Sequence, residues 1–188
     1  MSTDSNVDYP EFCTFTGLKN WELDILNSSW LELVGEDNSR RAETATSLVL
    51  WLFDNIPNMQ QRLSNKIPMS SHRSLLISDK MFLSHSFKLI GGLERLVHAS
   101  RDPKQLEREM KHLIRIHTHS KPPVGDQYFK HFRREFHVFL QERFKAQGDD
   151  ERIRIWQVLV DKFCDLIHEG ELHVIKREQE KRGCCCVQ

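Results

Sequence analysis

Two histidines stand where the apolar pattern of a helix calls for a hydrophobic side chain. In the segment 82–96 the stripe at helical spacing consists of Phe82, His85, Leu89, Leu93 and Leu96. In the segment 106–117 it consists of Leu106, Met110, Leu113, Ile114 and His117. This periodicity assigns both imidazoles to buried faces. Because burying an imidazole without a partner costs free energy, each is either a satisfied core residue or a ligand of something held between the two helices.

A large flat ligand such as an iron porphyrin suits two histidines on facing helices. It needs one neutral imidazole as axial ligand, apolar walls around the ring and, in some proteins, a second imidazole opposite. His119 competes with His117 for the axial role but lies about 200° further round the helix, beside its break, and ranks lower. A zinc site of His112, His117 and His119 is disfavoured because these side chains diverge. The sequence has no CxxCH motif, so a haem would be held noncovalently.

The elements that must position these histidines all have helical periodicity, and none of the long segments has the alternation of a strand. The predicted helices cover residues 23–33, 45–53, 82–96, 106–117, 129–144 and 153–167. The second ends near Pro57, because the residue before a proline leaves the helical region. Residues 58–78 contain Pro68 and several serines, which predicts an irregular segment with room for short helical turns. The fold class is therefore all-α.

Composition limits the class of protein. The chain has 188 residues, with 27 acidic and 27 basic side chains, so we expect about one domain and no general affinity for nucleic acid. No apolar run approaches the roughly 20 residues needed to cross a bilayer, and residues 1–25 lack the pattern of a secretory signal. Five cysteines without a framework spacing suit a reducing compartment. We discern no catalytic triad, so an enzymatic role is not expected.

The order of several markers resembles the globin family over residues 18–170. These markers are Trp30, "LFDNIP" at 52–57, "HSFKLIGGL" from His85, "LIRIH" ending at His117, "YFKHF" at 128–132 and Trp156. The divergent spacing and the extensions look like those of an invertebrate globin, in particular a nematode one.

This resemblance implies a globin fold around a haem b pocket. His117 would be the proximal iron ligand and His85 the distal histidine, with Leu89, Val49 and Phe53 in the distal pocket. Ala45 and Ser86 match the crossing of the second and distal helices, where small side chains permit close approach. These are implications of the resemblance and identify which residues to examine.

Two departures from the family pattern affect the distal side. Leu63 stands where globins nearly always carry a phenylalanine against the haem, which keeps an apolar wall but loses aromatic packing. The segment between His85 and His117 is longer than in vertebrate globins. His85 can therefore either stabilise a bound diatomic ligand or bind the iron as a sixth ligand, and the sequence leaves both open.

The C-terminal residues "CCVQ" match a prenylation box of the farnesyl type, with Cys185 as the modified residue. One lipid chain binds membranes marginally, so Cys184 is a candidate for palmitoylation. The alternative is an unmodified exposed cysteine cluster.

We therefore expect an N-terminal extension at 1–17, a globin domain at 18–170 and a charged tail at 171–188. The expected protein binds haem and a diatomic ligand such as oxygen, or works in one-electron redox chemistry with a partner or in sensing, on the cytoplasmic face of a membrane. The alternative function is a haem-free helical adaptor that the lipidated tail holds at the membrane.

Overall fold

The computed structural model describes residues 11–64, 67, 72–120 and 124–184, except the side chains of residues 178 and 181–184. The described residues form α-helices and one isolated bridge between Phe12 and Lys19, which confirms the all-α prediction. The helices are α1 Asn20–Val34, α2 Asn38–Asn55, α3 Met59–Arg62, α4 Arg73–Leu76, α5 Lys80–Ala99, α6 Pro103–Thr118, α7 Asp126–Phe144 and α8 Glu151–Cys184. The two four-residue helices α3 and α4 are the short helical turns expected in the irregular segment.

Aspartate caps fix where three of the long helices begin. The side chain of Asp37 accepts a hydrogen bond from the backbone N–H of Arg40 and starts α2. The carboxylates of Asp79 and Asp102 each accept hydrogen bonds from two backbone N–H groups, at the starts of α5 and α6 respectively. Such caps satisfy amide groups that have no partner within the helix. Pro103 follows its cap at the first position of α6, where a missing N–H costs nothing.

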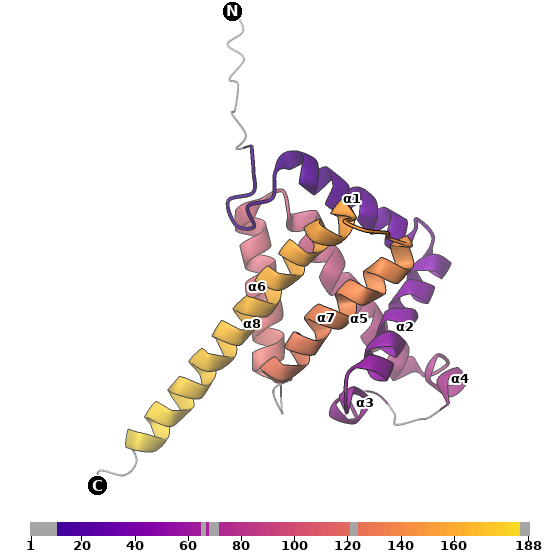
Figure 1. Cartoon of the computed structure of the whole chain (residues 1–188). Coiled ribbons are helices and arrows are strands. Elements are labelled where there is room, and N and C mark those ends of the chain that lie inside the picture. Colours follow the sequence, from indigo (N-terminus) through magenta and orange to yellow (C-terminus); the bar gives the residue numbers. More distant parts are fainter. Residues whose placement is uncertain (1–10, 65–66, 68–71, 121–123, 185–188) are drawn as a thin grey trace, which may run out of the picture.

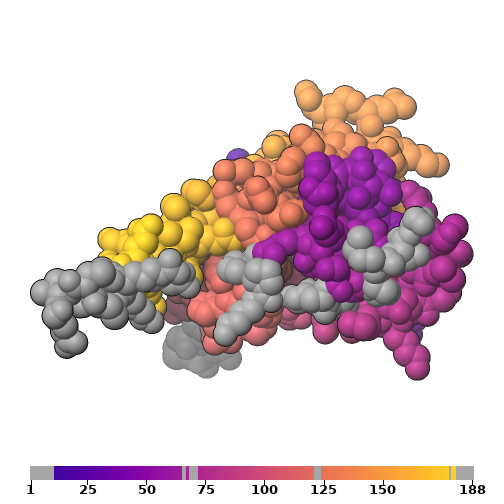
Figure 2. All heavy atoms as spheres, turned by 90° about the horizontal axis from the view of Figure 1, so that it is seen from below, coloured from indigo at the N-terminus to yellow at the C-terminus, as the bar shows by residue number. Residues whose placement is uncertain are grey.

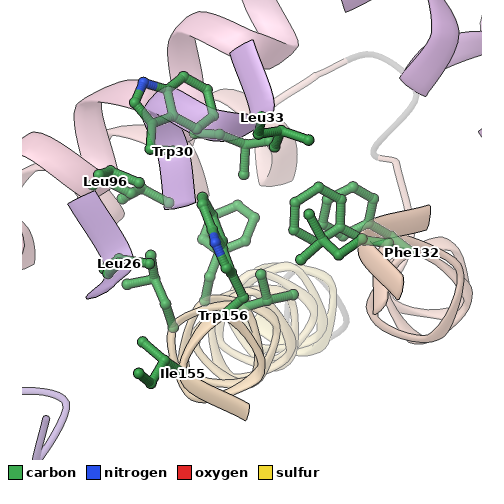
Figure 3. Packing of buried hydrophobic residues seen from close by; sticks show 14 of the residues in the cluster. Leu26, Trp30, Leu33, Leu96, Phe132, Ile155 and Trp156 are labelled. Atoms are coloured by element: carbon green, nitrogen blue, oxygen red, sulfur yellow. The ribbon is translucent and has the colours of Figure 1, made fainter. Parts of the chain in front are cut away.

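The largest part of the core lies where α1, α5, α7 and α8 meet (Figure 3). The rings of Trp30 on α1 and Trp156 on α8 have centroids 6.0 Å apart, and both side chains are almost fully buried. The indole N–H of Trp156 donates to the hydroxyl of Ser29 over 2.9 Å, so this buried polar atom is satisfied. The pair joins the first and last helices of the chain.

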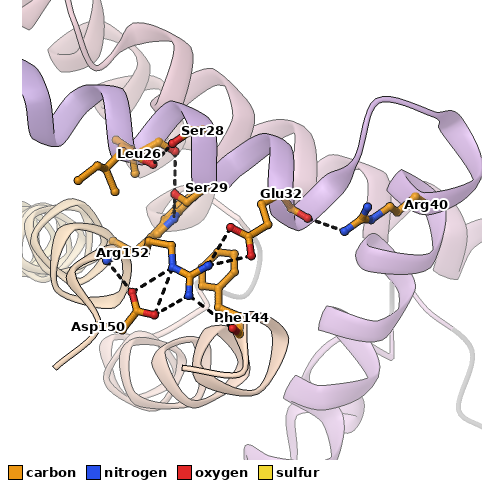
Figure 4. Close-up of polar contacts among 10 residues, drawn as sticks. Leu26, Ser28, Ser29, Glu32, Arg40, Phe144, Asp150 and Arg152 are labelled. Carbon is orange, nitrogen blue, oxygen red and sulfur yellow. Dashed lines mark hydrogen bonds and ion pairs between the residues drawn. The ribbon is translucent and has the colours of Figure 1, made fainter. Parts of the chain in front are cut away.

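Arg152 fastens the α7–α8 connection to α1 (Figure 4). Its guanidinium donates to both carboxylate oxygens of Glu32 over 2.8 Å and to the carboxylate of Asp150, and it lies 4.7 Å from the ring centroid of Phe144. These hydrogen bonds raise the pKa of Arg152 above its ordinary value. The turn is thereby held against the helix that begins the fold.

The buried apolar residues form two separate clusters. The main core contains residues of α1, α2, α5, α6, α7 and α8. The small cluster consists of Val49, Leu63, Ile67, Leu76 and Phe82. Met59 and Leu89 are partly buried and pack against both clusters. The molecule therefore has a seam between a large and a small apolar region.

One end of the molecule collects the elements that surround this seam (Figure 1). The end of α2, the short helices α3 and α4, the start of α5, the end of α6 and the start of α7 lie there, whereas α1 lies at the opposite end. Figure 2 looks onto this face, with the α2 and α3 region in purple between α7 in salmon and α4 and α5 in magenta. The far end of α8 projects beyond the other helices on the same side of the molecule. No helix among the described residues is long and apolar enough to cross a bilayer.

Candidate functional site

His117 lies in the last turn of α6 with its ring fixed by its own helix. Its Nδ1 atom is 2.7 Å from the carbonyl oxygen of Leu113, one turn earlier. A carbonyl oxygen only accepts, so this contact assigns the proton to Nδ1 and the lone pair to Nε2. A neutral imidazole with the lone pair on Nε2 is the form that binds a metal ion, and a backbone partner on Nδ1 is the usual way of fixing it. The His117 side chain is thus in a ligating tautomer.

Two phenylalanines hold the His117 ring from the side. Phe129 on α7 meets it edge-to-face with centroids 5.2 Å apart and planes at 90°, and Phe163 on α8 does so at 6.3 Å and 74°. The two phenylalanines also contact each other with centroids 6.0 Å apart. Both are buried, whereas His117 is half-buried. The imidazole therefore cannot turn without disturbing the junction of three helices.

Hydrogen bonds hold the backbone that follows His117 close to this residue. The carbonyl of His117 accepts a hydrogen bond from the Ser120 hydroxyl over 2.9 Å and one from the Val124 N–H over 3.4 Å. The carbonyl of Val124 accepts from Nε of Arg62, at the end of α3, over 3.4 Å. The Arg62 guanidinium also lies 6.0 Å from the Tyr128 ring centroid. These contacts connect the last turn of α6 to the opposite side of the seam.

The residues predicted as distal-pocket walls gather in and around the small cluster. Val49 and Leu63 are members of it, and Phe53 and Leu89 pack against it. The Phe53 ring meets the Phe82 ring edge-to-face with centroids 6.1 Å apart. Four predicted wall residues from α2, α5 and the end of α3 are thus brought together on one side of the seam.

His85 lies on α5, between Phe82 one turn earlier and Leu89 one turn later. Its side chain is half-buried rather than fully buried, although the periodicity assigned it to the buried face. Of its two neighbours along this face of α5, Phe82 belongs to the small cluster and Leu89 packs against it.

The competing histidines lie elsewhere. His119 is the residue that ends α6, and its side chain is exposed with Nδ1 3.0 Å from the Thr118 hydroxyl. His112 is exposed on the outer side of the same helix. No group of three or more His, Cys, Asp or Glu side chains in the described part of the chain is arranged to hold a metal ion.

Ala45 and Ser86, the small residues predicted at the crossing of two helices, are fully buried in the packed helices α2 and α5.

The lipidation residues fall outside this description. Cys185 is not among the described residues, and Cys184 is the last residue of α8, with a side chain that is not described. The prenylation and palmitoylation of these cysteines stay predictions.

Sequence reasoning missed the residues that fix His117. Periodicity predicts a helix over residues 129–144 but does not single out Phe129, which contacts the imidazole. Phe163 lies within the predicted helix 153–167, where no feature of the sequence links it to His117. Ile67 and Leu76, which complete the small cluster, lie in the segment predicted as irregular, where no periodicity marks a buried side chain.

The residues present fit a haem group. His117 offers an imidazole in the tautomer set by its Nδ1 contact to Leu113, and the small cluster offers an apolar surface separate from the main core. A haem needs one axial imidazole, a hydrophobic surround and an open edge. Here α6 provides the imidazole, and α2, α5 and the end of α3 provide the hydrophobic surround.

Comparison with known proteins agrees with this arrangement. Residues 52–167, which include every histidine of the site, match the Globin family. A protein from Biomphalaria glabrata described as "Globin" is 26% identical over 146 residues, which is 77% of this chain and 93% of that protein. The family match spans the end of α2, α3 to α7 and the first half of α8, and these elements carry His85, His117 and both phenylalanines. The chain belongs to the globin family and has its all-α fold.

Proposed function

We propose that this globin binds haem b noncovalently with His117 as the proximal ligand, and that it binds a diatomic ligand such as oxygen or exchanges single electrons. The observation that carries the proposal is the hydrogen bond of 2.7 Å between His117 Nδ1 and the Leu113 carbonyl, within contacts to Phe129 and Phe163. It supplies an imidazole in the right tautomer, in a fixed orientation, at an apolar seam.

Bound haem would supply reversible ligand binding and one-electron redox chemistry. The chain's own residues orient and protect it. Leu113 holds the proton of His117 on Nδ1, and Phe129 and Phe163 prevent rotation of the ring. Val49 and the other members of the small cluster exclude water from the distal side.

His85 has two possible roles in this proposal. From α5 its imidazole can donate a hydrogen bond into the distal space, or it can occupy the sixth coordination position itself. The first role favours ligand storage or sensing, and the second favours electron transfer with a redox partner. The two predict different spectra and are separated below.

The proposal extends to location. We propose that residues 171–188 form a tail in which farnesylated Cys185 and palmitoylated Cys184 hold the protein on the cytoplasmic face of a membrane, with the globin domain at 18–170 and an extension at 1–17. Continuous helix from Glu151 to Cys184 supports this, because it carries the chain directly to the cysteines. The nematode-type lineage is proposed from the long distal segment and the two extensions alone.

The test is an absorption spectrum of the purified protein after haem addition. We expect a Soret band, its loss or strong shift in His117→Ala, and an unchanged band in His119→Ala. His119 is the matched control because it is an exposed histidine two residues away on the same helix end. Absence of the band in the wild-type protein, or its persistence unchanged in His117→Ala, would contradict the assignment and favour the haem-free adaptor.

The ferrous spectrum separates the two roles of His85. Sharp split visible bands that disappear in His85→Ala indicate that both axial positions carry histidine. A single broad visible band in the wild-type protein assigns His85 to the distal space. Either outcome leaves the proximal assignment of His117 untouched.

A further inference from the structure

The end of the molecule that carries the haem site also presents exposed apolar side chains. Large hydrophobic residues with about half or more of their surface exposed occur on α4, the start of α5, the end of α6 and the far part of α8. They are Leu75 (63%), Ile77 (46%), Met81 (54%), Ile116 (48%), Leu172 (54%) and Ile175 (50%). We call these residues the apolar rim. The other exposed large hydrophobics among the described residues are Phe12, Trp21, Leu31 and Phe87.

Cations stand beside the apolar rim. Lys80 adjoins Met81, Arg115 adjoins Ile116, and Lys176 and Arg177 follow Ile175; all four are exposed. None of the four forms an ion pair with another described residue. Their charges are therefore available to an anionic partner.

Three acidic side chains at the same end are engaged within the protein, whereas Glu169 and Glu180 on α8 are exposed. The Asp79 carboxylate accepts the first amides of α5. The Glu171 carboxylate accepts the backbone N–H groups of Gly125 and Asp126 over 3.1 and 2.7 Å at the start of α7. Asp126 in turn pairs with Lys130 over 2.7 Å. The surface offered by this end thus combines aliphatic side chains with the exposed charges of Lys80, Arg115, Lys176 and Arg177, beside the two exposed glutamates of α8.

The far end of α8 lies on the same side. α8 passes α6 closely at Gly170, where an added Cβ would lie 2.7 Å from Cγ2 of Ile114, and then continues past the body to Cys184. Four residues follow, and they are the proposed lipidation box. A lipid attached there would bring this end, and not the α1 end, to the bilayer (Figure 1).

We propose that the apolar rim and its cations dock on an anionic lipid surface, so that the end of the molecule with His117 and the small cluster faces the membrane. This rests on the proposed lipid tail and adds an orientation to it. Aliphatic side chains interspersed with lysine and arginine suit the boundary between headgroups and acyl chains, because the apolar parts insert while the cations meet phosphate and serine headgroups. A protein partner would instead require a contiguous apolar patch, whereas the rim residues are spread over four helices.

The experiment uses the full chain produced in eukaryotic cells, with its lipidation determined by mass spectrometry. Binding to vesicles of phosphatidylcholine and phosphatidylserine is compared for the wild type, Leu75→Glu/Ile77→Glu and Leu172→Glu/Ile175→Glu. The matched control is Trp21→Glu/Leu31→Glu, on exposed positions of α1 at the opposite end. Circular dichroism verifies that each variant is folded, which is expected because every substituted side chain is exposed.

Each rim variant should lower the partition coefficient by about tenfold, and the α1 variant should not. Hydrogen exchange should slow on vesicles in residues 72–81 and 168–177 and stay unchanged in α1. Equal binding of the rim and control variants, or protection confined to the chain beyond residue 178, would overturn the docking face. A vesicle-independent dimer that the rim variants abolish would assign the surface to a second copy instead.

Failure of the lipid tail is distinguishable from failure of the docking face. An unmodified Cys185 in the mass spectrum contradicts the proposed anchor. The same comparison of rim and control variants on the unmodified chain then decides the orientation, because the apolar and electrostatic contributions of the rim do not depend on the lipid.

Discussion

Replacing Gly170 with alanine tests whether the close approach of α6 and α8 sets the position of His117. The added Cβ would lie 2.7 Å from Cγ2 of Ile114 and 3.4 Å from Cγ2 of Thr118. The first distance is shorter than real carbon contacts, and Cγ2 is attached directly to the Ile114 Cβ, so rotation of the side-chain end gives no relief. Ile114 and Thr118 flank His117 on the last turn of α6. The two helices must therefore separate at the turn that carries the ligand.

Two opposing contributions give the magnitude. Alanine in a helix interior is more favourable than glycine by about 1 kcal/mol. Overpacking of a tight contact costs about 1–3 kcal/mol. Gly170→Ala should therefore change the free energy of unfolding by between roughly zero and a loss of about 2 kcal/mol. Gly91→Ala on α5 is the matched control, because its Cβ would meet only Nη1 of Arg95 at 4.0 Å and should stabilise by up to about 1 kcal/mol.

Urea unfolding of both variants measures this difference. Ile114→Ala in the Gly170→Ala background should recover part of the lost stability, and a double-mutant cycle isolates that coupling. In the haem-loaded protein Gly170→Ala should also speed haem release, since the His117 turn is displaced. If Gly170→Ala stabilises the protein as much as Gly91→Ala does, the close approach has no energetic consequence and the reasoning is refuted.

Three further outcomes follow from two polar contacts within the fold and from the tail. Ser29→Ala should lower the free energy of unfolding by about 1–3 kcal/mol, because the buried indole N–H of Trp156 loses its hydrogen-bond acceptor. An unchanged midpoint of urea unfolding would show that this N–H has another acceptor in the variant. The Arg41 side chain, by hydrogen bonding, holds the pKa of Glu94 below its ordinary 4.5, so the stability that Glu94 contributes is fully present above that pH and is lost as the pH falls through the lower folded pKa. Glu94→Gln should thus be less stable than the wild type by about 1–3 kcal/mol at pH 7, with the gap closing in acid; a gap independent of pH would contradict the ion pair. Cys185→Ser should move the protein to the soluble fraction of cells, and retention on membranes would argue against the lipid anchor.

The helices were predictable because long amphipathic segments repeat their apolar residues at helical spacing. The stripe through Phe82 and Leu96 corresponds to α5, and Pro57 marks the end of α2 within two residues. The four-residue helices α3 and α4 were expected only as turns, because one turn is too short for periodicity to appear.

The site was predictable as a set of histidines and walls, but not as a geometry. Periodicity put His117 on an inner face, yet it could not show that Nδ1 points to Leu113. Nor could it select Phe129 and Phe163 among eleven phenylalanines. Periodicity indicates that a side chain faces the core, but it does not indicate which other side chain it contacts there. Such choices depend on how α6, α7 and α8 cross.

The division of the apolar residues into two clusters has a consequence for folding without the cofactor. Among the described residues the small cluster has five buried members and joins the main core through Met59 and Leu89, so it offers little cooperative resistance to local opening. In the haem-free protein α3, α4 and the start of α5 should fray while the tryptophan-centred core stays folded. Haem binding would then be the last folding step, and much of the favourable free energy of binding would be offset by the cost of ordering these elements.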